Sequence, residues 1–342
     1  MEPNSRRPLS RQTGFTLVEI MVGLAIGMLA TLVIMQVFSV FEAQKRVTTG
    51  TADAQTNGGI ALYNIGRELQ MAGYPLMPVT DSPLECTTTT IDPLAGVGGI
   101  FPVAITDGGA AAGASDSITI RYGTTMTGGV PTPITAMVGQ TATVANNLGC
   151  QGNNIALIVN GTACAVTSAS AVVASTTTIT LQNTTGAIAN ANLSCLGVWN
   201  EIVYGVNNGN LDRSGVPSVA GIVNVQAQYG VSNTAASNQV TQWVNASGGT
   251  WAAPAVADRN RIKSVRVAVV ARNAKMEPAA VTAACSSTTA AAPTGLCAWA
   301  GSASSPAPTI DLSNDPDWLR YRYRVFETII PLRNMIWSKD TL

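Results

Sequence analysis

Residues 15–35 read FTLVEIMVGLAIGMLATLVIM and are almost entirely apolar. A helix rises about 1.5 Å per residue, so this stretch is long enough to cross the ~30 Å hydrocarbon core of a bilayer. The preceding residues are basic, with Arg6, Arg7 and Arg11, and the positive-inside rule predicts a cytoplasmic N-terminus and an exported remainder. The stretch is longer than the core of a secretory signal peptide, and no A-x-A motif closes it. We therefore expect a transmembrane helix that is retained.

The junction between the basic segment and the apolar stretch carries an acid, Glu19. A charge inside a membrane is costly and usually functional, so a plain membrane anchor does not explain this residue. The junction sequence TGFTLVE, residues 13–19, resembles the class III signal of type IV prepilins. The resemblance implies that a prepilin peptidase cuts between Gly14 and Phe15 on the cytoplasmic side. It also implies that Phe15 is then N-methylated and that the apolar stretch stays in the mature protein.

The same resemblance gives Glu19 a role in assembly. Cleavage leaves an ammonium group on Phe15, and the Glu19 carboxylate of one subunit is expected to pair with that group of a neighbour inside a helical bundle. At low dielectric constant such a pair attracts strongly, and either charge left alone is penalised. We therefore expect Glu19 to set the axial register of incoming subunits and to be dispensable for membrane insertion.

The helical pattern continues beyond the apolar stretch but becomes amphipathic. Ala61, Ile65 and Leu69 recur every fourth residue, which predicts an apolar stripe packed against another part of the protein. The Gly-Tyr-Pro sequence at residues 73–75 is a stop signal, so we expect one long helix over residues 15–72.

Two segments of this helix have unfavourable composition. Residues 48–51 read TTGT and residues 57–59 read NGG, and a Gly costs about 1 kcal/mol relative to Ala in a helix. We therefore expect a kink or local melting there. The chain is thus predicted to comprise a removed leader (1–14), a transmembrane and filament-core helix (15–36), its amphipathic continuation (37–72) and an exported β-rich head (73–342).

Alternation of apolar and polar residues predicts strands in the head. In residues 219–229 the apolar face is expected to hold Val223, Val225, Ala227 and Tyr229. Residues 261–272 and 321–332 also alternate, with arginines on a solvated face or, alternatively, in a basic patch for an acidic partner. Further strands are expected at residues 116–122, 155–159, 171–173 and 178–181. The predicted fold class is α+β, a long N-terminal helix packed on an antiparallel β-sheet.

Two connections in the head have distinctive composition. Asn208-Gly209 lies between two strand-like segments and suits the positive φ angles of a type I′ hairpin turn. The alternative, a calcium loop over residues 207–212, has a single acid, Asp212, where an EF-hand loop needs several. Residues 279–308, rich in Ala, Ser, Thr and Pro, are expected to form a long surface loop.

The cysteine content suits an oxidising compartment. The chain has six Cys, no His and no CxxC pair, which disfavours structural zinc and fits disulfides. Six cysteines allow many connectivities. Closeness in sequence favours two local pairs, Cys150–Cys164 and Cys285–Cys297, with free thiols in a reducing compartment as the alternative.

Four C-terminal segments strengthen the resemblance. They are GVNNGNLDR (205–213), VQAQYGV (225–231), RIKSVRVAVVARN (261–273) and RYRVFETIIPLRN (322–334), and in this order they resemble PilW-type minor pilins. Residues 81–185 resemble no family. The resemblance implies a minor pilin that acts with other minor pilins and the major pilin to initiate a type IV pilus, first in the inner membrane and then at the cell surface. The alternatives are a pseudopilin of a type II secretion system and an adhesive or ligand-binding pilus tip.

Composition disfavours other functions. The 19 basic and 19 acidic residues cancel, so no basic patch for nucleic acid is indicated. Without His there is no Ser-His-Asp or Cys-His arrangement, and no Walker loop or dinucleotide-binding motif is present. Asp311, Asp315 and Asp317 cluster around Pro316 and suit turns better than catalysis. We expect no enzymatic activity, cofactor, metal or small-molecule substrate.

Overall fold

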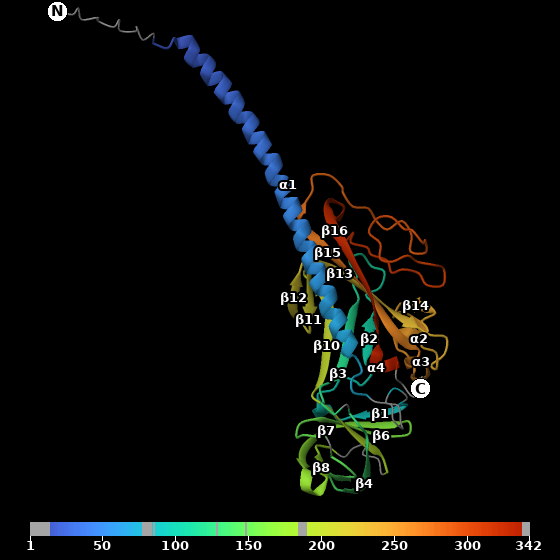
Figure 1. Ribbon diagram of the computed structural model, residues 1–342. Helices are drawn as coiled ribbons and strands as arrows, with labels where there is room; N and C mark the ends of the chain where they lie inside the picture. The colour runs from blue at the N-terminus through green and yellow to red at the C-terminus, as the bar shows by residue number, and fades with distance from the viewer. Residues whose placement is uncertain are drawn as a thin grey trace, which may run out of the picture. The chain divides into compact units, whose positions relative to one another are not determined.

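The computed structural model describes residues 14–76, 84, 86–127, 129–147, 149–183 and 190–336 (Figure 1). The chain divides into two units, residues 1–50 and residues 51–342, and each is described by itself. The long helix α1 (Leu17–Met71) contributes to both units. The predicted leader lies outside the described residues, apart from Gly14.

Helix α1 is helical through both segments with unfavourable composition, so the predicted local melting is wrong. Packing explains the continuity at residues 57–59. A Cβ atom at Gly58 would collide with the ring of Phe326, so the glycine allows this side chain to pack directly against the helix. The helix ends as predicted, because Gly73 takes a φ of 79° and its N–H donates to the carbonyl of Arg121 at 2.9 Å.

The second half of α1 buries its predicted apolar stripe. These side chains join one core cluster with residues from two antiparallel sheets, which gives the α+β arrangement that the sequence predicts. The buried residues of the helix in this cluster are Ala54, Ala61, Ile65 and Leu69, continued by Ala72 beyond the helix end.

The first sheet has the order β12-β11-β10-β3-β2. Its β10–β11 hairpin turns at Asn208 and Gly209, whose φ angles are 49° and 72°, as a type I′ turn requires. The predicted hairpin is therefore present. The strands are β2 (Val103–Thr106), β3 (Ser117–Gly123), β10 (Trp199–Asn207), β11 (Asn210–Arg213) and β12 (Val216–Ala220).

The second sheet has the order β14-β13-β15-β16. Its long central strand is buried on both faces, whereas the sequence predicted one solvated face. The strands are β13 (Ile222–Val231), β14 (Gln242–Val244), β15 (Ile262–Met276) and β16 (Tyr321–Pro331).

Two side chains of this sheet lie in places that the sequence did not predict. A bulge between Ile222 and Asn224 moves Val223 off the face that holds Val225, and Val223 packs into a cluster on the opposite face. Arg266 is only 4% exposed. Its Nε donates to Gln228 Oε1 at 2.7 Å, and its guanidinium carbon lies 4.9 Å and 4.5 Å from the ring centres of Trp243 and Trp299. The prediction that this arginine faces solvent is wrong.

The predicted long loop, here residues 277–317 and named the outer loop, covers the face of the sheet on which Val223 lies. It contributes its own apolar side chains to the cluster that contains Ala268 and Val270 of β15. Those loop side chains are Leu296, Ala298, Trp299, Ile310 and Leu312. The loop therefore forms a third layer of the head, and this layer explains the two-sided burial of β15.

The third sheet has the order β1-β7-β6-β9-β4-β5-β8, and an additional β7–β8 pairing closes six of these strands into a barrel. The barrel interior is apolar, with Ile158, Ile179, Leu181 and Leu193 fully buried. The strands are β1 (Thr88–Ile91), β4 (Thr132–Val138), β5 (Thr141–Val144), β6 (Ile155–Asn160), β7 (Ala163–Val173), β8 (Thr178–Leu181) and β9 (Asn192–Gly197). The predicted segment 171–173 is thus the end of a much longer strand.

Three disulfides are formed, Cys86–Cys164, Cys150–Cys195 and Cys285–Cys297. The last is the local pair that the sequence predicts. The predicted Cys150–Cys164 pair is wrong, because β1 pairs in parallel with β7 and sets Thr89 opposite Cys164, close to Cys86. Cys86–Cys164 and Cys150–Cys195 join residues far apart in sequence, and both lie in the barrel sheet or in the segments that flank it.

The remaining helices are short. They are η2 (Pro93–Ala95), η3 (Ala174–Thr176), α2 (Gly249–Ala252), α3 (Val256–Arg259), η4 (Trp318–Arg320) and α4 (Arg333–Ile336). Met335 of α4 is buried in the main core, and Asn334 donates to the carbonyl of Ala72 at 3.0 Å, which fixes the C-terminal segment to the end of α1.

Candidate functional site

The start of α1 is a capping box formed by Thr16 and Glu19. The backbone N–H and the hydroxyl of Thr16 donate to Glu19 Oε2 at 2.9 Å and 3.0 Å, and the Glu19 N–H donates to Thr16 Oγ1 at 3.3 Å. Such reciprocal bonds satisfy amide groups that a helix start leaves unpaired. Glu19 therefore fixes where the helix begins, two residues after Phe15.

The capping role was not inferred from the sequence, although the signal was present. Thr16-Leu17-Val18-Glu19 has the T-x-x-E spacing of a capping box directly before an apolar run. Gly14 and Phe15 precede the box and are exposed, Phe15 at 86%. The residues at which the sequence predicts processing thus lie beside the acid at one exposed helix start.

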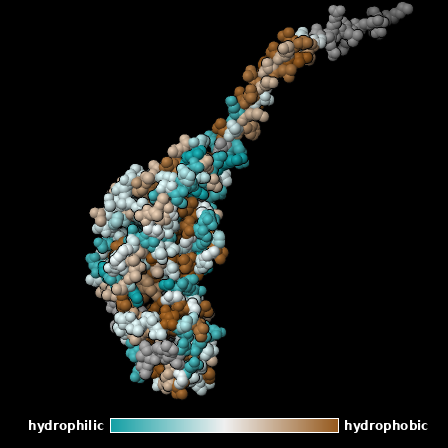
Figure 2. Space-filling model, turned by 180° about the vertical axis from the view of Figure 1, so that it is seen from behind, coloured by the Kyte–Doolittle hydropathy of each residue, from teal (hydrophilic) through white to brown (hydrophobic). Residues whose placement is uncertain are grey.

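The first half of α1 exposes its large apolar side chains. Figure 2 shows hydrophobic side chains along this part of the helix, and none of the most apolar window of eighteen residues is buried. A helix that is apolar on all sides needs lipid or other helices around it. This half is therefore the surface of the molecule with the greatest need for a partner.

A groove of about 470 Å³ runs between the second half of α1 and the edge strand β16. Tyr63 and Ile329, on its two sides, are 66% and 56% exposed. The lining residues are Gly59, Leu62, Tyr63, Gly66, Arg67, Gln70, Thr328, Ile329, Ile330 and Pro331. The groove has apolar walls and one cationic residue, Arg67, and it lies beside the edge strand β16.

An ion pair fixes α1 against the β10–β11 hairpin. Arg213 Nη2 lies 3.0 Å from Glu68 Oε1, and the Glu68 side chain is only 3% exposed. Burial and the neighbouring Glu68 carboxylate raise the pKa of Tyr122 to about 12. Sequence reasoning missed this pair, because a charge on the packed face of a helix is visible only once the facing strand is known.

The other sites considered from the sequence have structural roles. Residues 207–212 belong to the β10–β11 hairpin, and no group of three or more potential metal ligands occurs among the described residues. The carboxylates of Asp311 and Asp317 accept from the Ser313 N–H and from Arg320, respectively, as turn residues do. Asp315 pairs with Arg272 at 3.0 Å.

Two family models match the chain. Residues 9–35 match the prokaryotic N-terminal methylation motif, and residues 182–334 match the model of the type IV pilus-assembly protein W. The chain belongs to the PilW type of minor pilin. This minor pilin functions in type IV pilus assembly, and its methylation motif and apolar helix indicate membrane anchoring. No curated protein and no solved structure gives a significant match to it.

Proposed function

We propose that this PilW-type minor pilin takes part in initiating the pilus, in a complex with other minor pilins and the major pilin. A prepilin peptidase cleaves between Gly14 and Phe15, and Phe15 is N-methylated. The capping box supports this assignment, because it begins the helix immediately after the proposed cut and leaves Phe15 exposed. The protein is a structural component and catalyses no reaction.

The proposed topology is a single pass through the inner membrane. The N-terminus lies in the cytoplasm, residues 15–36 cross the membrane, and residues 73–342 form a periplasmic head that later reaches the cell surface. The exposed apolar half of α1 supports this topology, since it needs lipid before assembly and helices afterwards.

In the filament, Glu19 pairs with the Phe15 ammonium group of a neighbouring subunit. The observation that carries this role is the position of Glu19 in the first turn of α1, within the otherwise apolar stretch of residues 15–35. In the single subunit its Oε2 accepts from Thr16. The carboxylate has capacity for further hydrogen bonds, because it accepts through two oxygens. One residue therefore caps its own helix and holds a neighbour.

Two substitutions at Glu19 separate these roles. Gln at this position preserves a capping box but removes the charge, whereas Ala removes both. We expect Glu19→Ala and Glu19→Gln to insert into the membrane normally and to be absent from sheared pili. Glu42→Ala is the matched control, since Glu42 is an exposed acid of the same helix that pairs with Arg46 at 3.0 Å. Normal incorporation of Glu19→Gln would refute charge pairing.

The groove between α1 and β16 receives the helix of a neighbouring pilin. Its apolar walls on Tyr63 and Ile329 suit the exposed apolar face of such a helix. We expect Ile329→Lys to lower the recovery of other pilins in crosslinked complexes. Val216→Lys is the control, because Val216 is 66% exposed on β12 and lies outside the groove. Equal recovery with both variants would exclude the groove.

A further inference from the structure

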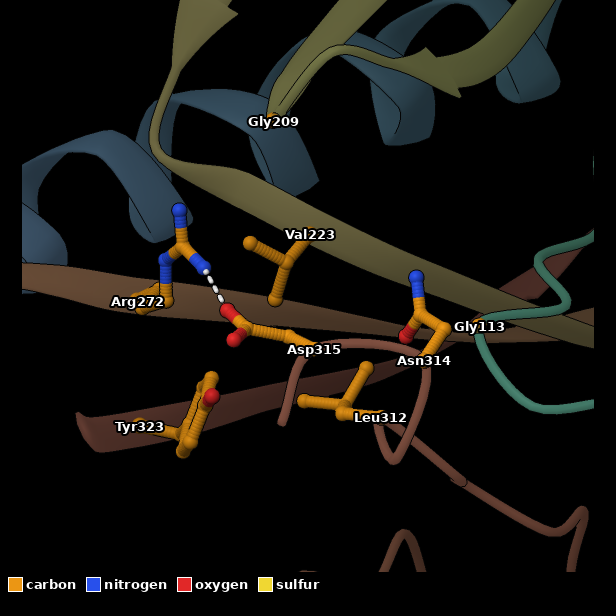
Figure 3. Close-up of a pocket in the computed structure, with 8 residues that line it drawn as sticks. All are labelled: Gly113, Gly209, Val223, Arg272, Leu312, Asn314, Asp315 and Tyr323. Carbon is orange, nitrogen blue, oxygen red and sulfur yellow. Dashed lines mark hydrogen bonds and ion pairs between the residues drawn. The ribbon is translucent and has the colours of Figure 1, made fainter. Parts of the chain in front are cut away.

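A small polar pocket lies in the head and shares no lining residue with the groove between α1 and β16 (Figure 3). Its volume is about 190 Å³, which corresponds to roughly six water molecules at ~30 Å³ each and is the scale of one sugar ring. Four parts of the chain enclose it: the loop before β3, the β10–β11 turn, the sheet, and the outer loop. The lining residues are Gly113, Gly209, Val223, Arg272, Leu312, Asn314, Asp315 and Tyr323.

The charges in this pocket cancel. Arg272 Nη1 donates to Asp315 Oδ2 at 3.0 Å, and each side chain is about one-third exposed, at 33% and 34%. The Arg272 guanidinium also lies over the ring of Tyr321, 4.6 Å from its centre, and Asp315 Oδ1 accepts from the Asp317 N–H at 3.0 Å. The pair is therefore held in place from both sides. An anion in the pocket would meet Asp315, and a cation would meet Arg272.

The remaining groups of the pocket are neutral hydrogen-bonding groups over an apolar base. Asn314 contributes an amide, and Figure 3 shows its side chain beside Gly113. Gly113 has a φ of 78°, and a Cβ atom there would collide with the Asn314 amide. Burial raises the pKa of Tyr323 to about 12, so its hydroxyl keeps its proton at neutral pH. Val223 and Leu312 supply apolar surface.

The rim of the pocket is fixed before any ligand binds. The Gly113 N–H donates to the carbonyl of Asp311 at 2.8 Å, which ties the loop before β3 to the outer loop. Leu312 is buried in the cluster beneath the outer loop. Ordered polar groups lower the conformational cost of binding.

We propose that this pocket binds an uncharged sugar residue of a glycan. A sugar ring presents adjacent hydroxyls that both donate and accept, which matches Arg272, Asp315, Asn314 and the Tyr323 hydroxyl. Its C–H face matches Val223 and Leu312. This site would give the minor pilin a ligand-binding role in addition to assembly, and it does not depend on how the helix is processed.

Saturation-transfer NMR on the full chain, in a detergent without a sugar headgroup, tests the proposal. The probes are D-glucose, D-galactose, D-mannose and N-acetyl-D-glucosamine, with sialic acid as the anion and glucosamine as the cation. We expect saturable binding of at least one neutral sugar and weaker binding of both charged probes. No saturable neutral sugar, or tighter binding of a charged probe, would overturn the proposal.

Variants then assign the binding to this pocket. Asp315→Asn is expected to weaken neutral-sugar binding about tenfold or more, and to admit sialic acid because Arg272 loses its counter-charge. Tyr323→Phe, which removes a hydroxyl without changing charge, is expected to weaken binding as well. Asp258→Asn is the matched control, since Asp258 pairs with Arg261 outside the pocket. Unchanged binding in Tyr323→Phe and Asp315→Asn, or an equal loss in Asp258→Asn, would contradict the site.

Discussion

The four-stranded sheet and the barrel are stabilised in different ways. One face of the sheet, β13 to β16, packs on α1, and the other face packs under the outer loop. Ion pairs such as Arg272–Asp315 join the sheet to that loop. The barrel strands lie in a segment with no Asp, Glu, Lys or Arg between Arg121 and Glu201. Their order depends on an enclosed apolar interior and on two disulfides. The family match covers the sheet and only the last barrel strand.

This difference shows which part of the molecule depends on the long helix. Ile65 and Leu69 of α1 are fully buried in the cluster that includes the sheet, whereas the barrel interior contains no residue of α1. Loss of helix packing should therefore affect the sheet, and loss of disulfides should affect the barrel. The predictions below test this separation.

The largest effect is expected from removing a barrel disulfide. Cys150→Ser combined with Cys195→Ser opens a bridge with a sequence separation of 45, which the chain-entropy model values at about 4 kcal/mol. Hydrogen exchange should increase in β4 to β9 and remain slow in β15. The control, Cys285→Ser with Cys297→Ser, spans 12 residues and should loosen only the outer loop. Faster exchange in β15 after the barrel change would contradict the separation.

Leu69→Ala is expected to act on the opposite region. The side chain is fully buried against the sheets, and truncation of a buried Leu costs about 3–4 kcal/mol. Denaturant unfolding with exchange mapping should show destabilisation of β13 and β15. Tyr63→Ala, on the exposed side of the same helix, should change the unfolding free energy by less than about 0.5 kcal/mol. A comparable loss of hydrogen-exchange protection throughout the barrel would contradict the separation between the two regions.

The pH dependence of stability should also separate the regions. Burial raises the pKa of Asp116 to about 6, even though its carboxylate accepts from the N–H groups of Gly108 and Ala227. The folded state therefore binds this proton more tightly than the unfolded state does. Asp116 should make the protein less stable as pH rises from about 4 to about 6, by at most about 3 kcal/mol.

Thermal unfolding of the wild type and Asp116→Asn across this pH range measures the effect. The difference in melting temperature between the two proteins should change with pH through that window and level off above it. Residues 123–200 have no titratable side chain apart from disulfide-bonded cysteines, so local exchange in the barrel should not follow this titration. A pH-independent difference between the two proteins would refute the assignment.

The smallest expected effect compares two adjacent glycines of α1. Gly58→Ala makes a methyl group collide with the Phe326 ring and should destabilise the protein by about 1–2 kcal/mol. A Cβ atom at Gly59 meets nothing within 4 Å, so Gly59→Ala should stabilise the helix by up to about 1 kcal/mol. Urea unfolding of both variants checks the direction. If both substitutions changed the unfolding free energy in the same direction, helix propensity, not packing on β16, would determine the effect at Gly58.

The same contrast explains how far the sequence predicted the fold. The β10–β11 hairpin and strands β15 and β16 were predicted because their residues alternate or carry an Asn-Gly turn. The barrel was not predicted as a unit. Strand β6, IALIVN, is buried on both faces and so shows no alternation, and β7 changes partner at a bulge near Ala169. Closure of a ring depends on pairings that no local pattern records.

Predictions for single residues failed for the same reason. The partner of Cys164 follows from a parallel β1–β7 pairing between segments far apart in sequence. The burial of Arg266 depends on Trp299 and the rest of the outer loop lying over the sheet. The helix end at Gly73 could be predicted because the Gly-Tyr-Pro stop rests on conformations that these residues themselves prefer. The capping box of Thr16 and Glu19 also depends on neighbouring residues, and its spacing is visible in the sequence.

Mass spectrometry of the N-terminus of the mature polypeptide tests the central proposal most directly. The account predicts a chain that begins with N-methylated Phe15 and keeps the whole apolar half of α1. An intact Met1, or a cut beyond residue 35, would contradict it.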